Sequence, residues 1–88
     1  MALTIQINPS VFPSGANVSI EIYSSAAGVC NLSLLSGNAG FSNGTTRKQV
    51  TLRSGINYFP ETISGSRGPH IIEARRDSET DRFQFNIN

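Results

Sequence analysis

The chain has 88 residues, of which 38% are hydrophobic and 15% charged, and seven Lys+Arg against six Asp+Glu give a formal net charge of +1. This length suits a single domain over residues 1–88 and leaves no room for a deep substrate cleft with a lid. The balanced charge argues against a nucleic-acid binder, which needs a clustered basic face, and it gives little attraction toward acidic membranes. We therefore expect neither nucleic acid nor a membrane as a partner.

Cys30 is the single cysteine, so no intrachain disulfide can form. Small secreted domains are often stabilised by disulfides, so the lack of an intrachain disulfide favours a protein made in a reducing compartment. The N-terminal segment 1–10 lacks the basic and apolar regions of a signal peptide. We interpret Met1-Ala2 as a natural start of a complete small protein, the alternative being a domain excised from a longer one.

Apolar and polar residues alternate with a period of two along almost the whole chain, which is the pattern of β-strands. Pro9 and Pro60 are expected to end strands, because proline cannot donate to a sheet ladder. In chain order the expected strands are 3–8, 17–25, 29–35, 47–53, 56–59, a short 61–65, 70–76 and 82–88. Short strands at this spacing predict an all-β antiparallel sandwich of seven to eight strands.

Turn-forming residues separate these strands. The segment 36–46 is rich in glycine and asparagine, and Asn43-Gly44 within it predicts a type I′ turn. The segment 77–81 (DSETD) predicts a polar hairpin turn. Its alternating acids look superficially like a calcium loop, but the longer loop, central glycine and final glutamate of an EF-hand are absent.

Three runs in the second half of the chain resemble immunoglobulin-like domains. They are L-x-x-G-x-N-x-F from Leu52, T-I-S-G-x-x-G-x-H-x-I-x-A from Thr62, and F-x-F-x-I from Phe83. The likeness extends over about residues 17–88 and implies an immunoglobulin-like β-sandwich, of the kind found in tailed-phage structural proteins and bacterial surface proteins. The tryptophan and disulfide of antibody-type domains are missing, and His70 stands where such domains more often have tyrosine.

His70 is the only histidine and the first residue to consider for catalysis. A catalytic triad needs a histidine held between a hydroxyl and a carboxylate, and no nucleophile-elbow motif is present. By alternation His70 shares a face with Ile72 and Ala74, so we interpret it as a structural residue whose ring contacts a backbone carbonyl. Gly68 turns the chain before it.

Cys30 lies among apolar neighbours with no basic residue or histidine beside it, which predicts a buried structural thiol rather than a reactive one. One cysteine and one histidine cannot form a zinc site without several carboxylates. We expect no metal and no cofactor. An enzyme is not expected either, because no set of acid, base and nucleophile converges in the sequence.

Candidate interaction residues are the polar row of the last strand, represented by Gln84 and Asn86, and the turn-rich segment, with Phe41 expected to be exposed and Asn43 beside it. The resemblance implies a non-enzymatic structural or interaction protein, either a phage capsid decoration (cement) protein or another virion structural protein. Its partners would be capsid or other virion subunits, or further copies of itself, and it would assemble in the host cytoplasm and reside in the virion. The alternative is an adhesive or spacer module at the bacterial cell surface.

Overall fold

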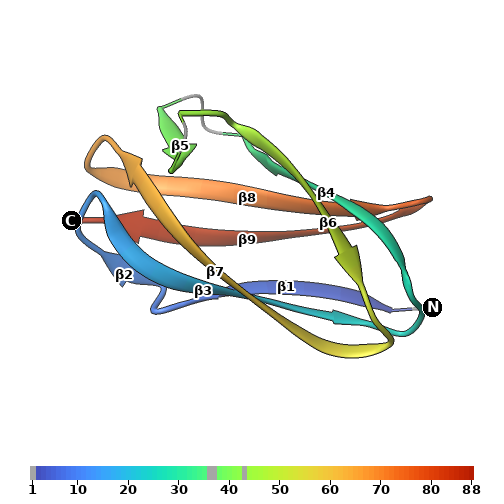
Figure 1. Ribbon diagram of the computed structural model, residues 1–88. Coiled ribbons are helices and arrows are strands. Elements are labelled where there is room, and N and C mark those ends of the chain that lie inside the picture. The colour runs from blue at the N-terminus through green and yellow to red at the C-terminus, as the bar shows by residue number, and fades with distance from the viewer. Residues whose placement is uncertain (1, 36–37, 43) are drawn as a thin grey trace.

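Two β-sheets face each other in the computed structural model, which describes residues 2–35, 38–42 and 44–88 (Figure 1). The four-stranded sheet has the order β1 (Leu3–Asn8), β3 (Ala16–Ser24), β7 (Gly55–Gly65), β5 (Ala39–Phe41). The five-stranded sheet has the order β2 (Val11–Phe12), β9 (Glu79–Ile87), β8 (Gly68–Arg76), β4 (Gly28–Leu34), β6 (Arg47–Leu52). The described residues contain no helix that could cross a membrane. The prediction of an all-β fold is confirmed.

The space between the sheets is filled by the apolar side chains that alternate inward along the strands. Phe85 of β9 is fully buried there, with its ring stacked on Phe12 of β2 and on His70 of β8, both at a centroid distance of 5.5 Å. The buried apolar residues are Leu3, Ile5, Ile7, Phe12, Val18, Ile20, Ile22, Cys30, Leu32, Leu34, Ala39, Phe41, Val50, Leu52, Ile63, Ile72, Ala74, Phe85 and Ile87. Burying them supplies the main driving force for folding.

The structure has nine strands in its described residues, against the seven to eight expected. The two-residue β2 lies between the expected strands 3–8 and 17–25, and the three-residue β5 lies in the turn-rich segment 36–46. Both are too short to show alternation. β2 also pairs parallel to β9, whereas the sequence predicted antiparallel pairing throughout. The other strand pairs are antiparallel.

Pro60 does not end a strand, because β7 continues through it from Gly55 to Gly65. Pro60 pairs with Ser19 of β3 on one side, while β5 pairs with β7 only at 63–65 on the other. A missing N–H therefore costs no ladder bond to β5 at this position. The predicted strands 56–59 and 61–65 are one long strand.

The hairpin between β8 and β9 is tighter than predicted. Arg76 pairs with Glu79, so the loop consists of Asp77 and Ser78 only, and Asp77 has a φ of 55°. Aspartate tolerates this left-handed conformation better than most residues. Asp81 lies within β9, where its Oδ2 accepts a hydrogen bond from the Ile5 N–H of β1 at 2.9 Å. That bond joins the two sheets at one open side.

Asn57 fixes the turn between β6 and β7 from inside the fold. Its Oδ1 accepts from the Arg53 N–H at 2.9 Å, and its Nδ2 donates to the carbonyls of Arg53, Gly55 and Ile22. The residue is 9% exposed. One side chain therefore satisfies backbone groups of the turn and joins the turn to β3.

Glu61 is a buried acid at the opposite open side of the sandwich, between β6 and β7. It forms an ion pair with Lys48, accepts from the Ser42 hydroxyl at 3.1 Å and accepts from the Thr62 N–H at 3.3 Å. Burial acts to raise the pKa of Glu61, but the Lys48 ammonium and these hydrogen bonds outweigh it and hold the pKa below its ordinary value. An inward-pointing charged pair of this kind blunts the β6 edge.

Replacing Asn57 with alanine should lower the free energy of unfolding by about 2–3 kcal/mol, because buried backbone groups lose their partner. Urea unfolding measures this. Thr62→Ala is the control, since it removes only an exposed bond to Asn17 and should change stability by less than about 1 kcal/mol. An Asn57→Ala protein as stable as the control would contradict this role for Asn57.

Glu61 should make the protein less stable in acid. Because its folded pKa is lower than its unfolded pKa, its contribution is present above the ordinary carboxyl pKa of about 4.3 and is lost as the pH falls through the folded value. Glu61→Gln should therefore flatten the loss of unfolding free energy between about pH 5 and pH 3. Urea titrations at several pH values test this, with Glu21→Gln, a half-buried glutamate on the outer face of β3, as the control. An unchanged pH slope in Glu61→Gln would show it to be wrong.

Candidate interaction surface

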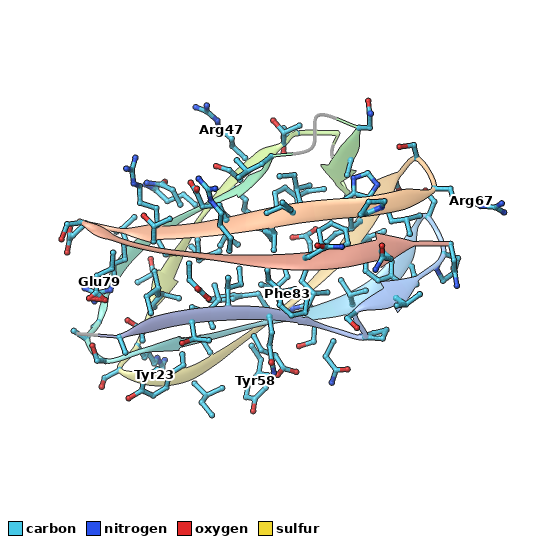
Figure 2. All side chains as sticks on the ribbon, turned by 180° about the vertical axis from the view of Figure 1, so that it is seen from behind. Tyr23, Arg47, Tyr58, Arg67, Glu79 and Phe83 are labelled. Atoms are coloured by element: carbon cyan, nitrogen blue, oxygen red, sulfur yellow. The ribbon has the colours of Figure 1, made fainter. Side chains whose placement is uncertain are left out.

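The outer face of the four-stranded sheet carries three large, exposed side chains that lie together. Tyr23 is 44% exposed, Ile56 63% and Tyr58 64%. Tyr23 of β3 is directly opposite Ile56 of β7, and Tyr58 follows Ile56 by two residues on the same face. Figure 2 shows both tyrosines pointing away from the body of the molecule, on the side opposite Arg47. We call Tyr23, Ile56 and Tyr58 the tyrosine patch.

The side chains of the tyrosine patch point to solvent because the residues next to them in each strand point into the core. Ile22 and Asn57 are buried, so the alternating residues on either side of them must face solvent. Among the described outward residues of β1, β3 and β7, Glu21 is the charged one, and its Oε1 accepts from the Gln6 amide at 2.6 Å. Tyrosine combines a large apolar ring with a polar tip, and this combination is enriched in protein interfaces.

Tyr23, Ile56 and Tyr58 are not among the interaction residues that the sequence predicts. The signal for Tyr23 is present in the sequence, because Tyr23 alternates with the apolar row Val18, Ile20 and Ile22 of the same strand. Ile56 and Tyr58 were hidden by the prediction of a short strand ending at Pro60. Only the continuous β7, with Asn57 turned inward, shows that both lie outside.

The expected interaction residues that the structure describes, Phe41, Gln84 and Asn86, do not form one surface. The prediction that Phe41 is exposed is wrong, because β5 pairs with β7 and turns Phe41 into the core, where it is 4% exposed. Asn43 lies outside the described residues. Gln84 is exposed on the outer face of the five-stranded sheet, and Asn86 is half-buried beside β2, its N–H donating to the Ser10 carbonyl at 2.8 Å.

His70 lies at the start of β8 with 3% exposure, its Nε2 2.7 Å from the Ser66 carbonyl oxygen and its ring stacked on Phe85. The contact is with a backbone carbonyl, the kind of partner that the structural interpretation expects. Gly68 precedes it with a φ of 128°, a conformation that favours glycine. The ring therefore packs against the core and has little contact with solvent.

Cys30 is fully buried in β4. Burial raises the pKa of the Cys30 thiol, and this outweighs the opposing effects of a backbone hydrogen bond at Arg75 and the charge of Arg76. A buried thiol with a raised pKa is a poor nucleophile.

The acids of the 77–81 segment point to different partners. Arg76, itself buried, forms ion pairs with Asp77 at 3.5 Å and Glu79 at 3.4 Å, whereas Asp81 reaches the backbone of β1. Within residues 2–35, 38–42 and 44–88, no three His, Cys, Asp or Glu side chains gather as a metal site would require.

Ser42, Lys48 and Glu61 form the cluster most similar to a catalytic arrangement, and sequence reasoning missed it because it joins three separate segments. The hydroxyl and the ammonium both donate to the same carboxylate. A carboxylate whose pKa is held low and which is already paired is a weak general base. The geometry fits an ion pair that closes the sandwich better than an activated serine.

A scan against protein-family models finds no match to this chain. A search of curated proteins finds no significantly similar sequence.

Replacing His70 with alanine should destabilise the fold by about 2–4 kcal/mol, because the carbonyl contact and the stacking on Phe85 are lost and a cavity remains. Thermal unfolding measures the change, with Arg67→Ala, an exposed residue of the preceding turn, as the control. If the His70→Ala protein is as stable as the wild type, His70 has no structural role, and a catalytic role would have to be considered again.

Proposed function

We propose that this chain is a non-enzymatic virion structural protein of a tailed phage, a capsid decoration (cement) protein that docks on the shell through the tyrosine patch. The observation that carries the proposal is the cluster of Tyr23, Ile56 and Tyr58 on a sheet face that is otherwise almost uncharged. Exposed apolar groups of this size on a rigid sheet are a feature of protein-binding surfaces.

Strand order supports an immunoglobulin-like assignment. In that fold the first, second, fifth and fourth strands form one sheet, and the third, sixth and seventh form the other. With β2 and β6 set aside as additions, the seven remaining strands follow this arrangement, as β1-β3-β7-β5 and β4-β8-β9. This agreement supports the resemblance independently of the sequence runs, although the fold by itself does not specify a function.

The dimensions of the molecule are compatible with docking by a whole sheet face. The molecule measures 34 × 20 × 20 Å. Its long face is similar in size to the roughly 800 Å² that each partner contributes to a standard protein interface. Docking would bury the two tyrosine rings and Ile56 against shell subunits, while the tyrosine hydroxyls and Glu21 supply hydrogen bonds at the rim.

The bacterial surface alternative relied on an exposed Phe41 in the 36–46 segment as a ligand-binding residue. Phe41 is in the core, so that observation no longer favours the alternative. It stays as an outcome of the test below.

The test uses the phage that carries the gene. We expect mass spectrometry of purified particles to find this chain in many copies, and particles from a gene deletion to bind the added purified protein. Tyr58→Ser should weaken that binding at least about tenfold, since central aromatic residues dominate interfaces. Val29→Ser is the matched control, because Val29 is an apolar residue of similar exposure, 51%, on the other sheet.

Particles that lack the chain, or an open reading frame that continues into a long secreted protein, would overturn the virion assignment and favour the surface module. Equal loss of binding in Tyr58→Ser and Val29→Ser would overturn the assignment of the face.

A further inference from the structure

The outer face of the five-stranded sheet has a different chemistry from the tyrosine patch. It contains an open hollow of about 860 Å³ over β4, β6 and β8. The side chains that give it its character are Arg47, Arg75, Asn31, Ser33, Gln49 and Glu73. We call this the arginine hollow.

The register explains the shape of the arginine hollow. Asn31 and Ser33 have short side chains and form its floor on β4, which lies between β8 and β6. Asn31 is opposite Arg75 of β8, and Ser33 is opposite Arg47 of β6, so a long arginine stands on each side. The two arginines lie two strands apart in the sheet, and their positions are offset by two residues in the strand direction. Their backbones are therefore about 12 Å apart.

The charges in the arginine hollow are unequally paired. Glu73 accepts from the Arg82 Nε at 2.9 Å, so one acid and one cation of this face satisfy each other. Arg47 and Arg75 form no ion pair with any other described residue. Figure 2 shows Arg47 extending away from the sheet. Two guanidinium groups are therefore free to bind acidic groups, each in a bidentate geometry.

We propose that the arginine hollow binds an extended acidic segment of a partner protein, with two carboxylates seated on Arg47 and Arg75 and the peptide backbone lying over Asn31 and Ser33. Asn31 and Gln49 carry amides that both donate and accept, which matches the alternating groups of a peptide backbone. Acidic residues four apart in an extended chain point to the same side and are about 13 Å apart, close to the arginine spacing.

Glu73 favours a peptide over a continuous polyanion. Its carboxylate lines the hollow on β8, two residues from Arg75 and across Ser33 from Arg47, and even when paired with Arg82 it places a negative charge where a continuous phosphate or sulfate chain would run. A peptide presents isolated carboxylates and, between them, backbone N–H groups that can donate hydrogen bonds to the Glu73 carboxylate. This binding uses residues separate from the tyrosine patch. Peptide binding and docking to a capsid can therefore be tested independently of each other.

The test is an NMR titration of the full chain with the blocked peptide acetyl-Glu-Thr-Ser-Thr-Glu-amide. We expect saturable shifts of amides in β4, β6 and β8, and binding that weakens as salt is added. The double variant Arg47→Gln/Arg75→Gln should weaken binding at least tenfold while keeping the wild-type spectrum elsewhere, because both residues are exposed. Arg67→Gln is the matched control, a cation in the turn between β7 and β8 that should leave binding unchanged.

Three results would overturn the proposal. The first is equal binding of the same peptide with glutamine in place of both glutamates. The second is an equal effect of Arg67→Gln and the double variant. The third is saturable binding of a sulfated hexasaccharide through Arg47 and Arg75 with no binding of the peptide, which would assign the hollow to an anionic glycan instead.

Discussion

The whole structure depends on strict alternation of side chains across two facing sheets. Each strand of this small chain has one apolar row, and the core exists only if all of these rows point inward at once. Phe85 shows the constraint most clearly, because its ring must meet Phe12 from β2 and His70 from β8 at the same position. A slip of one residue in β9 would turn Phe85 to solvent and Gln84 inward. The outer faces are therefore determined by the core, including the placement of Tyr58 and Arg75.

The two open sides of the sandwich are closed by polar contacts. On one side the Asp81 carboxylate accepts from the Ile5 N–H and links β9 to β1. On the other side the ion pair between Lys48 and Glu61 links β6 to β7. These contacts protect strand edges that would otherwise pair with other chains. They leave the flat outer faces as the surfaces available for partners.

The sequence was sufficient for the fold class and for most strands, because alternation is a local signal. It failed where a strand was too short to alternate, as in β2 and β5, and where Pro60 implied a break. Whether proline ends a strand depends on what lies beside it, and that is a property of the assembled sheet. Phe41 was misplaced for the same reason, since its burial depends on pairing with Ile63, a residue 22 positions later in the chain. Likewise the tyrosine patch and the arginine hollow join residues from separate strands, and no local pattern reveals them.

The two outer faces differ in chemistry. One presents aromatic rings with little charge, and the other presents two arginines that form no ion pair with another residue of the described part of the chain. A protein that docks on a shell by the first face would leave the second facing outward. The most direct test is a reconstruction of the phage particle at a resolution that shows side chains. Our proposal predicts this chain on the shell with Tyr23 and Tyr58 buried against capsid subunits; a particle in which the five-stranded sheet faces the shell, or in which the chain is absent, would contradict it.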